Sequence, residues 1–269
     1  MAIIVSELFF YPLKSARGLS IDQAQLDRFG ICQDRRWMLV DDSGVFVTQR
    51  KTPRLALVDV LLEENNLTLS VAAALQDYPT LRLTTPTADS HQRRVQVWND
   101  CCDALDAGNE AADWFSGFLR TSVRLVYMPD STQRQVDLEY AKEGDVVSFA
   151  DGFPLLLTTQ ASLDDLNQRL LHTIDISRFR PNVVASGSAP FAEDQWRKIR
   201  IGGVYFQVAK PCERCIMTTV DRHTGTKGKE PLATLSKFRR INNKVLFGQN
   251  LIHLNQGTIH RGDKIEVLE

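Results

Sequence analysis

Short β-type segments separated by turn residues recur along most of this 269-residue chain. In the first half they are expected at Ile3–Phe10, Leu19–Leu26, Arg36–Val40, Val45–Thr48, Leu55–Leu62, Leu67–Val71, Leu81–Leu83 and Val95–Trp98. In the second half they are expected at Asn182–Ala185, Trp196–Ile201, Val204–Ala209, Ile216–Val220, Leu251–Leu254 and Lys264–Leu268. Many short strands at this spacing are typical of a barrel or sandwich rather than of a doubly wound α/β sheet. The sequence therefore predicts a mainly β fold with a few helices.

Helical spacing or capping signals occur in three segments, Asn109–Leu119, Ser162–Leu171 and Pro231–Arg239. Asn109 is the expected N-cap of the first helix, and Ser162 with Asp165 is the expected capping box of the second. Pro231 stands at an allowed first-turn position of the third. The residues Asp41-Asp42-Ser43-Gly44 are expected to form the turn of a hairpin.

Composition and charge narrow the class of protein. Hydrophobic residues make up 43% of the chain and charged residues 24%, which is ordinary for a globular protein with a real core. The net charge of −1 gives no sign of a nucleic-acid or membrane-surface partner. No segment reaches the roughly 20 apolar residues that span a bilayer, and the N-terminus lacks a signal-peptide pattern. Five cysteines, an odd number, favour a reducing compartment. We therefore expect a cytoplasmic protein.

The pentapeptide Pro211-Cys212-Glu213-Arg214-Cys215 holds the only Cys-x-x-Cys of the chain. Lys210 and Arg214 lie beside the two thiols, and neighbouring cations favour the thiolate form that binds metals. A structural zinc site needs four ligands, but no second pair exists and His223 stands alone nearby. A redox pair would precede a helix, whereas strands are expected on both sides here. Two inert cysteines and a loop thiolate that binds a soft metal remain as interpretations.

A second candidate is Phe179-Arg180-Pro181-Asn182. The planar guanidinium of Arg180 suits a phosphate, and the Asn182 amide offers a donor and an acceptor to a heterocycle. Pro181 favours an extended conformation at Arg180, so that both side chains would leave one rigid stretch. An ion-paired surface arginine is the ordinary alternative.

Basic residues near the N-terminus form a third candidate. Lys14 lies in YPLKS, Arg17 follows, and Arg35 and Arg36 are adjacent in DRRW. Successive side chains of a strand face opposite ways, so that only one of Arg35 and Arg36 can point into a given site. A solvated basic face is the alternative. Asp151-Gly152 has the composition of a turn.

The polar segment Pro129–Gln135 is the expected boundary between two β domains, residues 1–128 and 129–269. Neither a repeat nor a low-complexity tract interrupts either part.

Taken together, these segments resemble the MOSC proteins, which bind a molybdenum cofactor, and among them the bacterial YcbX-type proteins and the mitochondrial amidoxime reducing component. YPLKS, DRRW and TQRKTPR resemble the N-terminal β-barrel domain of that family. FADGFP, QASLDDLNQRL, FRPNVV, PCERCIMTTVDRHTG and GTIHRGDKIEV resemble the MOSC β-barrel domain itself. The resemblance covers nearly the whole chain and implies two β-barrel domains with the cofactor between them.

The resemblance also assigns roles to single residues. It implies that Cys215 is the catalytic residue and the molybdenum ligand. It implies that the molybdopterin is bound by six further residues, Lys14, Arg35, Asp151, Arg180, Asn182 and Arg214. Lys14, Arg35 and Arg180 would neutralise the phosphate. The implied reaction is the two-electron reduction of N-hydroxylated compounds such as hydroxylaminopurines, amidoximes and hydroxylamines.

The resemblance leaves the electron source open. No cysteine follows Cys215, so we expect no iron–sulfur cluster within this chain. Electrons would come from a separate ferredoxin- or flavoprotein-type donor, or from an iron–sulfur domain beyond this chain. Two alternatives stand beside the reductase: a carrier of the cofactor or of sulfur without turnover, and a zinc-stabilised barrel.

Overall fold

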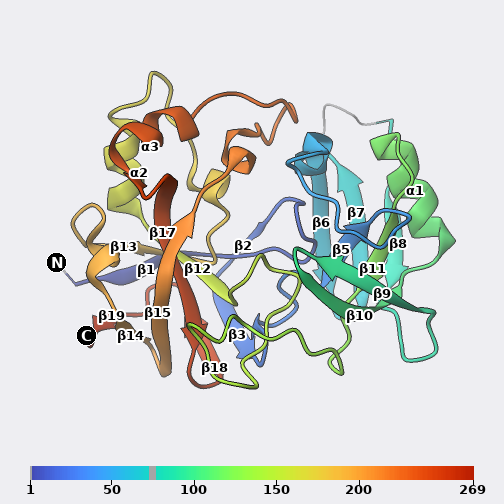
Figure 1. Ribbon diagram of the computed structural model, residues 1–269, viewed down its shortest axis with the longest axis horizontal. Coiled ribbons are helices and arrows are strands. Elements are labelled where there is room, and N and C mark those ends of the chain that lie inside the picture. Colours follow the sequence, from blue (N-terminus) through green and yellow to red (C-terminus); the bar gives the residue numbers. More distant parts are fainter. Residues whose placement is uncertain (1, 73–76) are drawn as a thin grey trace.

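The structure, a computed structural model, describes residues 2–72 and 77–269. The described residues form two halves side by side, with the second half on the left and the first on the right in Figure 1. Three α-helices occur in them, α1 (Asn109–Leu119), α2 (Gln160–Asn167) and α3 (Leu232–Phe238). The remaining regular structure is mostly strand, as expected from the sequence.

The second half is built on a nine-stranded sheet with the order β19-β14-β15-β17-β12-β13-β1-β2, in which β16 pairs with β17. Its strands are β1 (Ile4–Phe10), β2 (Leu19–Ile21), β12 (Leu155–Thr159), β13 (Val183–Ser186), β14 (Lys198–Ile201), β15 (Val204–Glu213), β16 (Arg240–Ile241), β17 (Lys244–His253) and β19 (Ile265–Val267). A bridge between Ile4 and Lys264 joins β1 to the start of β19. The sheet thus closes on itself, which removes exposed edges.

Smaller sheets complete the molecule. The first half contains β5 (Trp37–Val40), β11 (Arg124–Tyr127), β10 (Asp100–Asp106) and β9 (Gln92–Val97) in that order, and β6 (Val58–Glu63), β7 (Asn66–Val71) and β8 (Leu81–Thr84). Between the halves, β18 (Gly257–His260) pairs with β3 (Gln23–Asp27), which pairs with β4 (Gly30–Ile31). The helix α1 packs on the outer side of the first half (Figure 1).

Alternating burial along the strands builds a separate core in each half. In β7, Leu67 and Leu69 are buried while their neighbours are partly exposed, and in β14 the buried residues are Ile199 and Ile201. This period of two places one face of each strand in the interior. The first-half core also receives Phe115 from α1. Each half therefore has the apolar interior that its strands predict.

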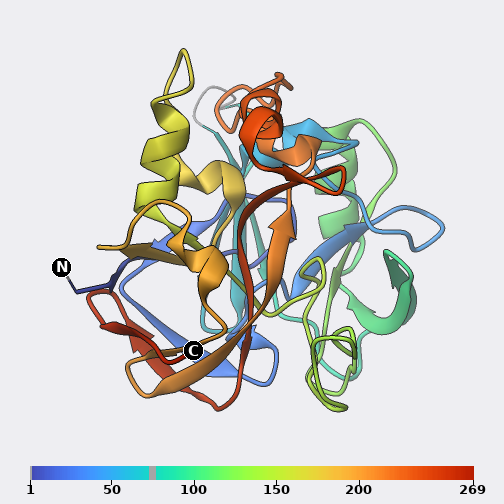
Figure 2. The ribbon, with the colours of Figure 1, turned by 60° about the vertical axis from the view of Figure 1, so that its left-hand side comes forward.

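The chain does not divide cleanly between the halves. The strand β1 pairs with β2 and β13, and β3 pairs with β4 and β18, so the strands β1 to β4 belong by pairing to the second half. Between them, Leu13 bridges to Trp37 of the first half. Residues 37–127 form the first half. The start of β1 and the C-terminal end both lie on the outer side of the second half, at the far left of Figure 1, and this side comes forward in Figure 2. The division into 1–128 and 129–269 stays a prediction.

Several local expectations are wrong. Ile216–Val220 was expected as a strand but forms the 3₁₀ helix η5 (Ile216–Thr219). The hydroxyls of Thr218 and Thr219 donate to the backbone oxygens of Cys215 and Ile216, at 3.0 and 2.8 Å. Such local bonds compete with a strand ladder.

The caps of two helices also differ from expectation. The first helix has its expected bounds, but Gly108 rather than Asn109 occupies the N-cap. The second begins at Gln160 and ends at Asn167, with Thr159 as its N-cap. The Thr159 hydroxyl accepts from the backbone N–H of Ser162, so Ser162 lies inside the first turn and is not the cap.

Some strand bounds shift. The expected strand Leu19–Leu26 is two strands, and Leu55–Leu62 starts as the 3₁₀ helix η1 (Pro53–Leu57) before β6. Val45–Thr48 makes only isolated bridges to nearby segments of the same polypeptide. Leu251–Leu254 coincides with the end of the long β17. The turn at Asp41–Gly44 is present, closed by Gly44 N–H donating to Asp41 O at 2.9 Å.

Candidate functional site

A narrow cavity of about 100 Å³ lies between the halves and adjoins an open groove of about 750 Å³. The cavity is lined by all six residues expected to bind the cofactor, Lys14, Arg35, Asp151, Arg180, Asn182 and Arg214. Cys215 lines the groove, and Cys212 lines both spaces. The fold therefore gathers residues from both ends of the chain at one place.

Lys14 reaches this cavity from the segment that follows β1. Its backbone N–H donates to Trp37 O, and its Nζ donates to Phe149 O and to Asp151 Oδ1, both at 2.6 Å. Burial lowers the pKa of Lys14 to about 8, although the Asp151 carboxylate opposes the shift. Desolvation acts to raise the pKa of Asp151, but the nearby Lys14 and Arg50 cations hold it well below its usual range. The pair is thus charged at neutral pH.

Arg35 and Arg36 diverge, but not because they lie on a strand. Arg35 has a left-handed backbone with φ of 52° in a turn before β5. Its Nη1 donates to Asn182 Oδ1 at 2.9 Å and also to Asp34, and its Nη2 donates to Arg180 O at 3.1 Å. Arg36 is buried elsewhere and donates to Met128 O. Only Arg35 faces the cavity.

The expectation of an extended Arg180 before Pro181 is wrong. Arg180 has φ 56° and ψ 47°, because its N–H closes the 3₁₀ helix η3 (Ile176–Phe179) by donating to Ser177 O at 3.0 Å. Its guanidinium lies 4.3 Å from the centre of the Tyr11 ring, and that of Arg35 lies 4.4 Å from the same ring. Desolvation and the Arg35 charge lower the pKa of Arg180 to about 10.

Asn182 is a buried junction, with 1% of its surface exposed. Its Oδ1 accepts from Arg35 Nη1 and from the Leu156 backbone N–H, at 2.9 and 3.2 Å. Its Nδ2 donates to Phe9 O at 3.3 Å. The amide is therefore occupied by protein groups and fixes the position of Arg35.

Each cysteine of the pair has its own arginine. Cys212 lies in β15, and Arg214 Nη1 donates to its Sγ at 2.8 Å. Burial raises the pKa of Cys212 in spite of that contact. Cys215 lies just before η5, and Arg50 Nε donates to its Sγ at 3.1 Å. The pair therefore has a strand on one side only, which corrects the expectation of strands on both.

Sequence reasoning missed Arg50 and Arg134. Arg50 lies in TQRKTPR, 165 residues before Cys215, and also donates to Asp151 Oδ2 at 3.3 Å. Arg134 is 4% exposed and donates to Ser148 O, Ala150 O and Asp151 O at 2.8, 2.6 and 3.1 Å. It holds the backbone of the segment that carries Asp151. No local pattern marks either residue, because both act through contacts distant in sequence.

Comparison with known proteins finds two family domains along the chain. The MOSC N-terminal beta barrel domain family matches residues 2–122, and the MOSC domain family matches residues 144–266. Mitochondrial amidoxime-reducing component 1 of Mus musculus is 37% identical over 282 residues, which cover 98% of this chain and 82% of that protein. The chain belongs to the MOSC family. The expected β-barrel architecture is confirmed by these matches.

A second curated relative and one solved structure also cover most of the chain. Mitochondrial amidoxime reducing component 2 of Bos taurus is 37% identical over 245 residues, covering 87% of this chain and 72% of that protein. A crystal structure of the YUAD protein of Bacillus subtilis covers 98% of this chain and 94% of that chain, with 11% identity and a TM-score of 0.45.

One expectation is overturned by these relatives. The curated MOSC relatives are named as mitochondrial proteins, so the prediction of a cytoplasmic location, which rested on cysteine count and the N-terminus alone, is wrong. No helix within residues 2–72 and 77–269 has the length and apolar character needed to cross a membrane.

The MOSC cavity fits the anionic part of the cofactor that the resemblance implies. Three buried guanidinium nitrogens have no partner among the described residues, namely Arg178 Nη1, Arg180 Nη2 and Arg214 Nε, and all three belong to residues that line the cavity or the groove. Leaving a buried donor unpaired is costly, and a phosphate would satisfy such donors. Cys215 offers a soft sulfur ligand in the adjoining groove.

The zinc alternative lacks a comparable donor set. In the part of the chain that the structure describes, no three His, Cys, Asp or Glu side chains are grouped so that they could hold a metal ion. A metal carried by a pterin needs no such group of protein ligands, because the pterin itself supplies donors.

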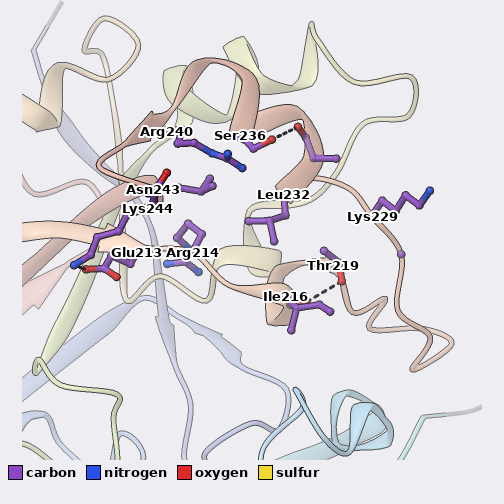
Figure 3. A pocket seen from close by; sticks show the side chains of 13 residues that line it. Glu213, Arg214, Ile216, Thr219, Lys229, Leu232, Ser236, Arg240, Asn243 and Lys244 are labelled. Atoms are coloured by element: carbon purple, nitrogen blue, oxygen red, sulfur yellow. Dashed lines mark hydrogen bonds and ion pairs between the residues drawn. The ribbon is translucent and has the colours of Figure 1, made fainter.

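A further cavity of about 540 Å³ lies on the other side of the cysteine loop. Figure 3 shows its labelled side chains, with Leu232 of α3 pointing toward Thr219 and Ile216, and Lys244 paired with Glu213. Arg214 lines this cavity as well as the narrow one. The segment from Cys212 to Cys215 therefore borders open space on two sides.

Proposed function

We propose that this protein is a molybdenum-cofactor-dependent reductase of N-hydroxylated compounds, the class that includes hydroxylaminopurines, amidoximes and hydroxylamines. Relatives named amidoxime-reducing components, similar over 98% of the chain, support this activity. The observation that carries the proposal is the position of Cys215, whose sulfur lines an open groove beside a cavity rich in cations. A phosphate fits the cavity, and a substrate fits the groove.

The proposed roles of the cavity residues follow from their charges and contacts. Lys14, Arg35 and Arg180 neutralise the phosphate of the molybdopterin, and Arg214 adds its unpartnered Nε. Asn182 holds Arg35, and Asp151 holds Lys14 and Arg50. Cys215 binds the molybdenum.

The reaction cleaves the N–O bond of the substrate, consumes two electrons and two protons, and yields the reduced nitrogen compound and water. When bound, the molybdenum cofactor supplies the two-electron redox chemistry of this step. The protein binds and orients both reactants. Arg50 fixes the Cys215 sulfur from the N-terminal domain, and Arg134 fixes the wall of the groove at Asp151.

Electrons come from outside the described site. We propose a separate ferredoxin- or flavoprotein-type donor, or an iron–sulfur domain outside this sequence. Either source can be replaced in an assay by reduced methyl viologen, which makes the activity testable without knowing the donor.

The test is metal content and activity of protein made in a host that synthesises the cofactor. We expect about one molybdenum per chain by elemental analysis, and reduction of benzamidoxime by reduced methyl viologen. Cys215→Ala should lose the metal and the activity, whereas Cys101→Ala, which alters an exposed cysteine of β10, should keep both. Molybdenum retained by Cys215→Ala would contradict the ligand assignment.

The same measurements test the alternative functions. Protein that carries molybdenum but reduces no N-hydroxylated compound would favour a carrier of the cofactor or of sulfur. Zinc in place of molybdenum would favour the zinc-stabilised barrel. Either result would overturn the reductase.

A further inference from the structure

The hairpin between β9 and β10 carries a tryptophan in an unusual conformation. Val97 and Asp100 are paired, so Trp98 and Asn99 form a two-residue loop. Trp98 has a φ of 56°, whereas Asn99 does not have a positive φ. A positive φ at the first position of such a loop strongly favours glycine. A bulky residue is rare in this conformation, and strained residues of this kind concentrate at functional sites.

The indole of Trp98 is supported by protein groups and open to the groove. The side chain is 42% exposed and lines the groove of about 750 Å³ that contains Cys215. The Arg50 guanidinium lies 4.3 Å from the ring centre, and the Phe46 ring centre lies 5.0 Å away. Within the described residues, no acceptor bonds the indole N–H. These contacts hold the ring without covering it.

Arg50 connects this ring to the proposed metal ligand. Its guanidinium packs on Trp98 while its Nε donates to Cys215 Sγ. Only one side chain therefore separates the indole from the sulfur beside which the substrate must react. The exposed part of the ring lines the same groove as Cys215 and suits the non-reacting part of a substrate.

We propose that Trp98 is the residue that selects the substrate of this reductase, by stacking on a planar aromatic group. This group is attached to the amidoxime carbon or to the hydroxylated nitrogen of the substrate. The inference rests on the proposed function and narrows its substrate class to aryl and heteroaryl compounds over aliphatic ones. Planar rings stack on indole with favourable dispersion and quadrupole interactions. The N-terminal barrel domain thus supplies selectivity, and the MOSC domain supplies the metal ligand.

The experiment compares benzamidoxime with acetamidoxime, which share the reacting group and differ in the ring. The protein comes from a cofactor-competent host, and reduced methyl viologen is the donor. Trp98→Gly should lower kcat/KM for benzamidoxime by about 3- to 10-fold, mainly through KM, and leave acetamidoxime nearly unchanged. Trp98→Phe should keep most of the preference. Glycine suits the positive φ, so Trp98→Gly is expected to fold.

Two controls separate this inference from a failure of the proposed function. Tyr205→Ala, which removes another exposed aromatic side chain outside the groove, should change neither substrate. Binding of both amidoximes, measured by calorimetry without an electron donor, tests the stacking even if the protein reduces neither compound. Equal effects of Trp98→Gly on the two amidoximes, in turnover or in binding, would overturn the assignment of Trp98.

Discussion

Arg50 of the N-terminal barrel domain donates a 3.1 Å hydrogen bond from Nε to the sulfur of Cys215 in the MOSC domain. The same guanidinium contacts Asp151 at 3.3 Å, and Asp151 contacts Lys14 at 2.6 Å. Four charged or ionisable side chains thus connect the two ends of the candidate site. The proposed phosphate-binding lysine and the proposed metal ligand belong to one electrostatic network.

Substitution of Arg50 tests the end of this network at Cys215. A guanidinium beside a sulfur attracts an anionic reagent to it. Arg50→Gln should therefore slow the alkylation of Cys215 by the anion iodoacetate severalfold in cofactor-free protein, as followed by peptide mass spectrometry, and affect the neutral reagent iodoacetamide less. Alkylation of Cys101, an exposed cysteine distant in sequence, serves as the internal reference. An unchanged rate at Cys215 would show that the contact has no influence on the sulfur.

The pH dependence of anion binding tests the end of the network at Lys14. Burial lowers the pKa of Lys14 to about 8, so its ammonium is present below that pH and is lost above it. A simple phosphate monoester is a dianion throughout pH 7 to 9.5, because its second pKa is about 6. Its affinity for cofactor-free protein, measured by calorimetry, should fall above pH 8 by up to about tenfold per pH unit. Lys14→Met should bind weakly with no such fall, and a fall of the same size in that variant would exclude Lys14 as its cause.

The buried Glu193 gives a stability prediction outside the site. The hydroxyls of Thr159 and Ser162 donate to its carboxylate, but desolvation still raises its pKa. The folded protein therefore keeps this proton to a higher pH than the unfolded chain, and stability falls as pH rises from about 4.5 through the raised pKa.

Glu193→Gln removes that pH dependence. The free energy of unfolding of the variant, relative to that of the wild type, should be higher at pH 8 than at pH 4. The increase should be about 1.4 kcal/mol for each pH unit that separates the pKa of Glu193 in the folded protein from its pKa in the unfolded chain. Urea unfolding at both pH values measures the difference. The exposed Glu143→Gln serves as the control and should show no such gain. A constant gap between Glu193→Gln and the wild type would contradict the buried, protonatable carboxyl.

Asn182 is expected to act through Arg35. Asn182→Ala leaves the Leu156 N–H and one N–H of Arg35 without their acceptor, which should lower the free energy of unfolding by about 2 kcal/mol. A double-mutant cycle with Arg35→Ala, read out as affinity for a phosphate monoester, should show strong coupling. Additive losses of affinity would mean that Asn182 does not position Arg35.

The sequence could predict the class of the fold because strand burial alternates locally. Leu67, Leu69, Ile199 and Ile201 are apolar and face inward, which any barrel of this kind requires. It could not predict η5, since the β-branched residues that favour a strand also bear the threonine hydroxyls that bond the local backbone. Local preference and local hydrogen bonding opposed each other there.

The candidate site could be predicted only where a residue lies in a distinctive motif. Six residues carried over from the resemblance line one cavity and Cys215 lines the adjoining groove, but their contacts could not be read from spacing. Arg180 adopts a left-handed backbone because it ends a 3₁₀ turn, which overrides the preference that Pro181 imposes. Arg50 lies in TQRKTPR, which resembles the family, but its role could not be read from that segment because its partner lies 165 residues away.

The placement of the strands β1 to β4 in the second half has a consequence for how such proteins can be recombined. A cut after residue 128 would separate β1 from β13 and β3 from β18. The remaining fragment would have an unpaired strand edge and would lack Lys14. A functional exchange of the N-terminal barrel between relatives must therefore replace an internal segment near residues 37–127 and leave the first strands in place. Such an exchange would transfer Arg50 and Trp98 together into the new protein.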